Sequence, residues 1–257
     1  MKLETYLERL DYAGPVEVTP ETLTRVHRAH HFAVPFENLD VWLKRRIELK
    51  EESFYRKIVG ERRGGFCYEL NGLFAAMLRQ MGFAVTLLSA RVPRKDSSFV
   101  PEFDHMVLRV DLERPYLADV GFGEAFQRPI PLQDGFEGEQ DGVRYRLLTV
   151  GDRWLAHRQN SGGEWNELYD FSLQPRALED FAEMCEYHQT SPDSSFTKRR
   201  ICTIATAEGR VTLADLRLII TRNGERLEKN LADEEEWRRC LKLYFAIELP
   251  DSRAFPA

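Results

Sequence analysis

One cysteine stands where a glycine pair leads into an amphipathic helix, in the run Arg63-Gly64-Gly65-Phe66-Cys67. The first turn of a helix carries unpaired N–H groups and a partial positive charge, and both favour a thiolate over a thiol. We therefore expect Cys67 to be a nucleophile with a lowered pKa. The helix is predicted from apolar residues at helical spacing, with Gly82 as its stop. Those residues are Leu70, Leu73, Phe74, Met77, Leu78 and Met81.

A buried structural cysteine has the same local signature, because Cys67 precedes Leu70 by three residues and shares its helix face. Two further polar residues favour the catalytic interpretation. His105 interrupts a run with strand-like alternation, and Asp119 lies within the apolar run from Tyr116 to Val120. Aspartate is disfavoured in strands, and a buried carboxylate needs a charged or hydrogen-bonding partner.

The segment from Asp111 to Pro115 has turn composition, so the runs on either side are predicted to pair as an antiparallel hairpin. If residues 111 and 115 face each other, 107 faces 119 and 105 faces 121. His105 and Asp119 are then diagonal neighbours on one face, about 7–8 Å apart at the backbone. A register shifted by one residue would separate them.

The periodicity of the chain changes twice. Residues 1–83 are mostly helical, and Thr19 and Pro20 form a good helix start. Residues 84–190 contain short β-rich runs separated by turn residues, which indicates an antiparallel sheet or barrel. Residues 191–257 mix strands, an Asn223-Gly224 hairpin signal and a final helix from Glu234 to Phe245. The remaining expected elements are a helix at 175–186 and strands at 85–92, 105–110, 116–120, 143–150, 153–158, 165–171, 201–205, 216–221 and near Arg226.

The composition is that of a soluble globular protein, with 257 residues, 43% hydrophobic residues and a formal charge of -6. This charge argues against a general binder of nucleic acids or anionic membranes. No apolar run approaches a membrane span and no signal-peptide core is present, so we expect a cytoplasmic protein. Cys67, Cys185, Cys202 and Cys240 are far apart, and they suggest neither a metal site nor disulfides.

Several segments together resemble the arylamine N-acetyltransferase family, over nearly the whole chain. They are Val34-Pro35-Phe36-Glu37-Asn38-Leu39, the run from Arg63 to Glu69, His105, Asp119-Val120-Gly121-Phe122-Gly123 and Ser191-Pro192-Asp193-Ser194-Ser195-Phe196. The resemblance implies a triad of Cys67 as nucleophile, His105 as base and Asp119 as the residue that orients it. It also implies an α+β fold with a cysteine-protease-like core. This fold has a helical domain (1–83), an antiparallel β-barrel (84–190) and an α/β lid (191–257).

The implied reaction is ping-pong transfer of an acetyl group from acetyl-CoA, through an acetyl-cysteine, to arylamines, arylhydrazines or N-hydroxyarylamines. Acetyl-CoA is then a substrate and no cofactor is bound. The resemblance places Phe36, Phe122 and Phe196 in the substrate pocket and makes Glu37 and Arg63 a buried supporting ion pair. Gly121 and Gly123 would let coenzyme A approach the backbone closely. The expected assembly is a monomer or homodimer.

Three other interpretations stay open. A transglutaminase-like or papain-like hydrolase also uses Cys, His and Asp or Asn in this order. An amide synthase of aromatic natural-product assembly would use the same residues as an acetyltransferase. A non-catalytic binding module would bury Asp119 without a purpose, which is costly.

Overall fold

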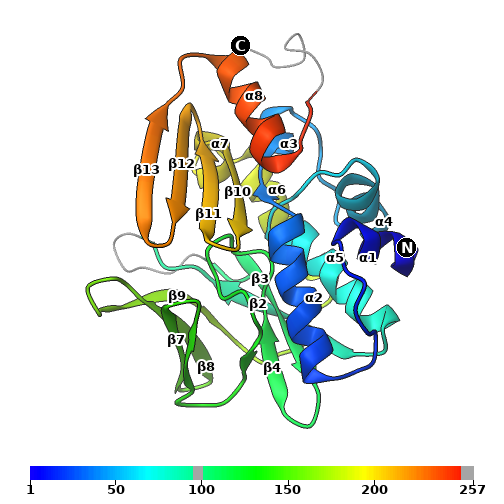
Figure 1. Ribbon diagram of the computed structural model, residues 1–257. Coiled ribbons are helices and arrows are strands. Elements are labelled where there is room, and N and C mark those ends of the chain that lie inside the picture. The colour runs from blue at the N-terminus through cyan, green and yellow to red at the C-terminus, as the bar shows by residue number, and fades with distance from the viewer. Residues whose placement is uncertain (95–100, 250–257) are drawn as a thin grey trace.

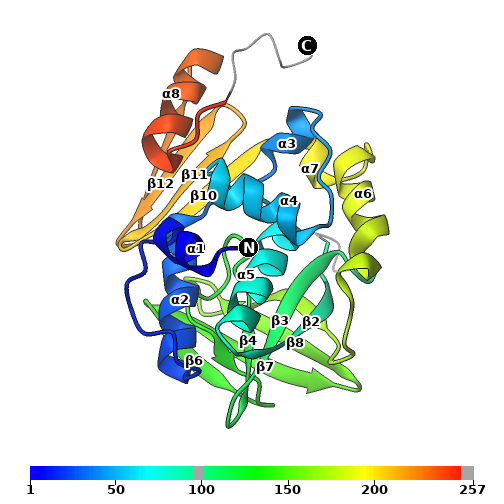
Figure 2. The same ribbon diagram turned by 90° about the vertical axis from the view of Figure 1, so that its right-hand side faces the viewer.

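The chain folds into N-terminal helices, an eight-stranded antiparallel sheet and a five-stranded sheet that carries the C-terminal helix (Figure 1). The computed structural model describes residues 1–94 and 101–249. In Figure 2, α1, α4 and α5 lie at mid-height, with the five-stranded sheet above and the eight-stranded sheet below. This arrangement confirms the predicted α+β fold class. No helix in the two described ranges is long and apolar enough to cross a membrane.

The N-terminal helices begin where the sequence supplies caps. The hydroxyl of Thr19 accepts a hydrogen bond from the Thr22 N–H at 3.1 Å, and Pro20 occupies the first turn of α2, as predicted. Gly82 follows α5 with a φ of +97°, the left-handed conformation that ends many helices. The helices are α1 (Leu3–Arg9), α2 (Pro20–Ala33), α3 (Leu39–Trp42), α4 (Glu51–Tyr55), the π-helix η1 (Arg56–Gly60) and α5 (Cys67–Gln80).

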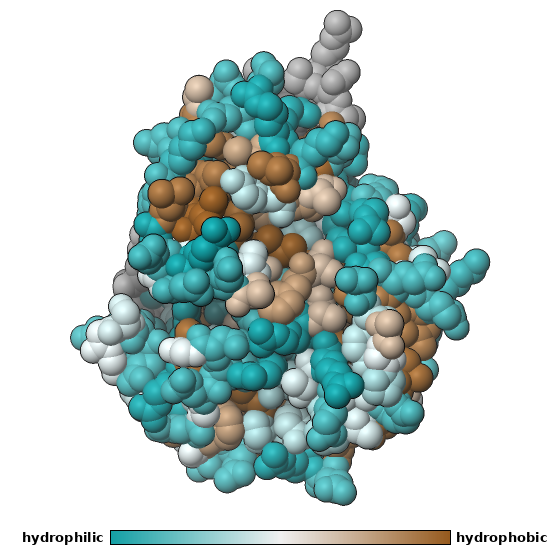
Figure 3. Space-filling model, in the orientation of Figure 1, coloured by the Kyte–Doolittle hydropathy of each residue, from teal (hydrophilic) through white to brown (hydrophobic). Residues whose placement is uncertain are grey.

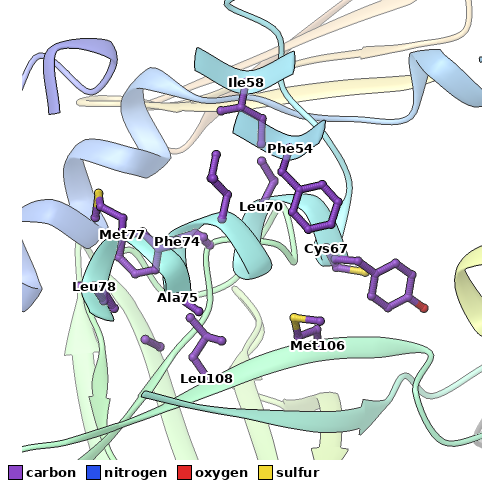
Figure 4. Packing of buried hydrophobic residues seen from close by; sticks show 14 of the residues in the cluster. Phe54, Ile58, Cys67, Leu70, Phe74, Ala75, Met77, Leu78, Met106 and Leu108 are labelled. Carbon is purple, nitrogen blue, oxygen red and sulfur yellow. The ribbon is translucent and has the colours of Figure 1, made fainter. Parts of the chain in front are cut away.

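Helix α5 is the centre of the N-terminal core. Its predicted apolar face is buried, and its first twelve residues are buried on every side. Figure 4 shows Phe54 and Ile58 on one side of the helix and Leu108 of β3 on the other. A helix enclosed in this way is held by packing more than by its intrinsic propensity.

The eight-stranded sheet curls into a nearly closed barrel with the strand order β5-β4-β3-β2-β9-β8-β7-β6. The side chain of Gln140 on the last strand bonds the backbone of Arg128, just before β5, at 2.8 and 2.7 Å. A side-chain amide thus joins the two edges where no strand pair does. The strands are β2 (Ala84–Arg91), β3 (His105–Asp111), β4 (Pro115–Ala118), β5 (Ile130–Pro131), β6 (Glu137–Gln140), β7 (Val143–Val150), β8 (Arg153–Gln159) and β9 (Trp165–Phe171).

The hairpin of β3 and β4 has the predicted register. Asp111 faces Pro115, and the last pair of the ladder is Leu108 with Ala118. This register places His105 and Asp119 on the same face.

The five-stranded sheet has the order β1-β10-β11-β12-β13, so a strand from the N-terminal region forms one of its edges. Trp237 of α8 is fully buried against the sheet. The predicted hairpin turn is present, with Asn223 and Gly224 at φ values of 50° and 84°. The elements are β1 (Phe36–Glu37), α7 (Ser195–Lys198), β10 (Ile201–Thr206), β11 (Gly209–Ala214), β12 (Arg217–Arg222), β13 (Glu225–Asn230) and α8 (Glu234–Phe245).

The edge strand β13 is exposed along its whole length and mostly charged. Such charges protect an open edge from pairing with another chain. Leu227 is its one large apolar side chain and is 64% exposed. On the face in Figure 3, hydrophilic side chains predominate, and apolar ones gather mainly over this sheet.

One predicted helix begins later than expected. The prediction of a helix at 175–186 was wrong for its first residues, because the Arg176 N–H bonds the carbonyl of Leu87 on β2 at 3.0 Å. The chain then forms the 3-10 helix η2 (Leu178–Phe181) and α6 (Ala182–Thr190). Contact with the barrel therefore overrides the local helical pattern.

Candidate active site

Cys67 is the first residue of α5 and is 3% exposed. Burial raises the pKa of its thiol well above the ordinary value, the charge of Asp104 adds to this, and a hydrogen bond from the Met106 backbone opposes it. Figure 4 shows Cys67 at the end of α5, above Met106. The expected lowering of the pKa by the helix terminus is therefore wrong for this structure, since desolvation outweighs it.

His105 and Asp119 are both buried, and the imidazole Nε2 lies 2.9 Å from the carboxylate Oδ2 of Asp119. Burial raises the pKa of Asp119, but the charge and hydrogen bond of His105, with further donors, outweigh burial and leave the pKa below its usual value. The carboxylate is thus kept ionised beside the imidazole. Because Nε2 faces Asp119, Nδ1 is the ring nitrogen left for another group.

Asn71 also holds Asp119, a contact that the sequence analysis missed. Its Nδ2 donates to Asp119 Oδ1 at 2.9 Å and to the Met106 carbonyl at 2.6 Å, while its Oδ1 accepts from the Val120 N–H at 2.9 Å. Asn71 follows Cys67 by four residues, which puts both on one face of α5. This four-residue spacing is the sequence signal that could have placed Asn71 near Cys67.

Gly121 brings the cysteine and the aspartate together. A Cβ at this position would lie 2.8 Å from the Cys67 Cα and 2.7 Å from the Asn71 Nδ2. Only glycine permits this approach of the Asp119 turn to α5. The close contact is internal, and the approach of coenzyme A to this backbone stays a prediction.

The four expected substrate residues lie in two groups. Phe122 packs edge-on against His105, with ring centroids 5.2 Å apart. Phe36 and Phe196 lie 6.0 Å apart, and Gly123, at a φ of +81°, would place a Cβ 3.8 Å from the Phe36 ring. One aromatic group thus adjoins the imidazole, and the other joins β1 to α7.

Tyr169 of β9 was missed by the sequence analysis. Its ring lies 5.2 Å from both His105 and Phe122. Proximity to Asp119 and burial raise the pKa of its phenol, with burial the larger cause. Nothing in the local sequence marks Tyr169, because tyrosine is common in strands and its contacts are with residues distant in sequence.

A buried ion network lies next to the cysteine loop, the turn at residues 63–66 that leads into Cys67. Arg63 binds Glu37 at 2.7 Å, as expected, and also Asp40 at 3.1 Å. Lys57 joins Asp40 and Glu69, each at 2.9 Å. Glu69 in turn accepts the Phe66 N–H at 3.1 Å, which caps α5. The network therefore connects β1, α3 and η1 to the turn that presents Cys67.

The described ranges contain no group of three or more His, Cys, Asp or Glu side chains with the geometry to hold a metal ion. The polar groups around Asp119 are instead satisfied by one another.

Comparison with known proteins gives a consistent result. A family model described as N-acetyltransferase matches residues 19–254. The chain is 34% identical to a pineal gland arylamine N-acetyltransferase of Gallus gallus, over 97% of this chain and 95% of that one. The chain belongs to the arylamine N-acetyltransferase family.

Further relatives agree with this assignment. A Salmonella typhimurium protein named arylamine N-acetyltransferase / N-hydroxyarylamine O-acetyltransferase is 33% identical, over 97% of this chain and 90% of that one. The Mycobacterium marinum arylamine N-acetyltransferase, solved in complex with CoA, superposes with a TM-score of 0.90 at 31% identity, over 96% of this chain and 93% of that one. The chain is therefore an acyltransferase of this family.

Proposed function

We propose that this arylamine N-acetyltransferase carries the acetyl group of acetyl-CoA on Cys67 and passes it to an arylamine. The observation that carries the proposal is the buried His105–Asp119 pair at 2.9 Å, beside a cysteine at the start of α5. The CoA complex of the Mycobacterium marinum relative supports acetyl-CoA as the donor. We further propose three domains: a helical domain (1–83), a barrel (84–190) and a lid (191–257). The protein is proposed to be cytoplasmic and to be a monomer or a homodimer.

The first half-reaction begins with proton transfer from the Cys67 thiol to His105. The thiolate attacks the thioester carbonyl of acetyl-CoA, the carbon–sulfur bond to coenzyme A breaks, and the imidazolium protonates the departing thiolate. The two thiolates are of similar stability, so the exchange suits cysteine. Asp119 orients the imidazole and stabilises its positive charge.

In the second half-reaction, the amine nitrogen attacks the acetyl-cysteine. His105 accepts the amine proton, the bond to the Cys67 sulfur breaks, and the thiol is restored. An N-hydroxyarylamine oxygen would react in the same way, and the name of the Salmonella relative supports this second acceptor class. The rings of Phe36, Phe122 and Phe196 would form apolar walls for a flat arylamine.

The raised thiol pKa bears on the role of His105. A buried thiol that does not ionise alone needs a base at the moment of attack. His105 is the base proposed to take that proton.

Intact-mass spectrometry of the native protein and of Cys67→Ala tests the proposal directly. Each is treated with acetyl-CoA and then with an arylamine. A single acetyl gain on the native protein alone, reversed by the amine, is the expected result. An equal gain on Cys67→Ala would contradict Cys67 as the carrier. Absence of both an adduct and amine-dependent CoA release would favour the hydrolase interpretation.

A further inference from the structure

The backbone of Asp119 is held by side chains of α2. The β3–β4 ladder ends at Ala118, so the next peptide needs other partners for its N–H and C=O groups. The Asp119 N–H donates to the Nε2 atom of His27 at 3.1 Å, and the Nε2 atom of His31 lies 3.2 Å from the Asp119 carbonyl oxygen. Two imidazoles, one helical turn apart, thus replace a neighbouring strand.

These contacts fix opposite tautomers on the two rings. The Nδ1 atom of His27 lies 2.8 Å from the carbonyl of Gln127, and a carbonyl only accepts, so Nδ1 carries the proton. Its Nε2 is then a free acceptor for the Asp119 N–H. His31 faces a carbonyl through Nε2, so this nitrogen carries the proton there.

We infer that His27 and His31 are positioning residues for the reaction, which hold the Asp119 peptide so that its carboxylate meets His105. The inference rests on the proposed triad. Holding the backbone from α2 leaves the carboxylate free: Oδ2 faces His105, and Oδ1 accepts from Asn71 and from the Gly121 N–H. Every polar atom of Asp119 then has a defined partner, and a small displacement of its peptide would move the imidazole.

The electrostatics of α2 agree with this role. Burial lowers the pKa of His27 to about 4, against the opposing effect of the Gln127 carbonyl and Asp119, and it lowers the pKa of His31 well below the ordinary value. Both rings are therefore neutral at pH 7. A proton on the Nε2 atom of His27 would turn an acceptor into a donor facing the Asp119 N–H.

His30 supplies a matched control on the same helix. It is as fully buried as His27, but neither of its ring nitrogens has a hydrogen-bond partner within the described part of the chain. Its ring packs against Tyr6 and Phe74. Replacing His30 therefore disturbs the packing of α2 without touching Asp119.

The experiment compares His27→Leu, His27→Gln and His30→Leu. The rate of acetyl-Cys67 formation is measured by rapid quenching and intact mass, and the pH dependence of Cys67 alkylation by iodoacetamide is recorded. We expect His27→Leu to slow acetylation by about tenfold, the effect of losing one buried hydrogen bond at the site. We also expect it to shift the pH dependence of the rate of Cys67 alkylation. His27→Gln keeps an acceptor at the ε position and should restore both, while His30→Leu should match the native protein.

Equal effects of His27→Leu and His30→Leu, or no recovery in His27→Gln, would overturn the inference. Rapid acetylation of both the native protein and His27→Leu would overturn it while leaving the Cys67 mechanism intact. Absence of any adduct on the native protein would remove the triad proposal and this inference with it.

A second measurement needs no variant and so does not depend on the folding of His27→Leu. Long-range ¹H–¹⁵N spectra of the ¹⁵N-histidine-labelled native protein at pH 7 report the tautomer of each ring. The expected result is a protonated Nδ1 on His27 and a protonated Nε2 on His31. A protonated Nε2 on His27 would contradict the contact with Asp119.

Discussion

At the scale of single residues, burial acts differently on the two ionisable ends of the proposed triad. It raises the pKa of the Cys67 thiol, whereas His105 and the N–H donors of Asn71 and Gly121 lower the pKa of the Asp119 carboxyl despite burial. The variant Asp119→Asn should therefore slow acetylation of Cys67 by at least about a hundredfold, because the imidazolium loses its counter-charge. Single-turnover mass spectrometry measures this rate. The exposed Asp193→Asn is the control, and a native rate in Asp119→Asn would contradict the role of Asp119.

Phe196 tests the acceptor pocket apart from the thiol chemistry. Its ring contacts Phe36, Phe66 and His188, and its carbonyl accepts hydrogen bonds from Asn38 and Trp42. We expect Phe196→Ala to raise the arylamine KM by about tenfold, as loss of buried aromatic contact predicts, with the rate of Cys67 acetylation unchanged. Steady-state and single-turnover kinetics separate the two effects. Equal losses in both half-reactions would count against the pocket assignment.

At the scale of elements, the contact between α5 and the turn after β4 depends on Gly121. In Gly121→Ala the new methyl group meets the backbone of Cys67, so we expect a loss of about 1–3 kcal/mol in the free energy of unfolding, as for overpacked cores. Urea denaturation measures it. Gly60→Ala is the matched control, because a Cβ at Gly60 has no atom within 4 Å. If the two variants are equally stable, the close approach is not obligatory.

The ion network next to the cysteine loop is also a property of several elements. Arg63→Met leaves Glu37 and Asp40 buried beside a single remaining cation, Lys57, and we expect a loss of about 3–5 kcal/mol in unfolding free energy. Arg239→Met breaks an exposed pair with Glu235 and should cost less than about 1 kcal/mol. Thermal or urea unfolding compares them. An Arg63 variant as stable as the Arg239 variant would refute the structural role.

The elements also show how far sequence reasoning reaches. α5, α8 and the β3–β4 register were predictable because caps, periodicity and turn residues lie within each segment. β1, β5, β6 and β11 were not predicted: β1, for example, is two residues long and is defined by its pairing with β10. The triad could be named from residue types and family resemblance. The contacts of Asn71 and His27 with Asp119 could not be predicted, because they span 48 and 92 residues of sequence.

At the scale of the whole molecule, three buried histidines of α2 link stability to pH. Burial holds the pKa of His27 near 4 and those of His30 and His31 well below the ordinary value, whereas the unfolded chain binds protons near pH 6.5. The unfolded state therefore binds more protons below that pH, and acid destabilises the fold. Glu69 acts in the opposite sense between about pH 4.3 and 7, because burial raises its pKa to about 7.

A comparison of variants isolates one histidine from these opposing groups. Between pH 6.5 and 5, each neutral buried histidine contributes a slope of about 1.4 kcal/mol per pH unit. As the pH falls, the free energy of unfolding should therefore decrease less steeply for His30→Leu than for the native protein, and the two slopes should differ by about 1.4 kcal/mol per pH unit. Urea denaturation across the pH range measures the difference. Identical slopes would mean that His30 is protonated in the fold or neutral in the unfolded chain.

The segments that meet at the site are unevenly distributed along the chain. Cys67, His105 and Asp119 fall within one stretch of sequence and are held together by α5 and a hairpin, whereas Phe196 arrives much later, just ahead of the five-stranded sheet. Under the proposed roles, substitutions after residue 190 can reshape the acceptor wall without disturbing the thiol and its base. Substrate range can then diverge among descendants of one ancestral enzyme while the chemistry of the cysteine stays the same.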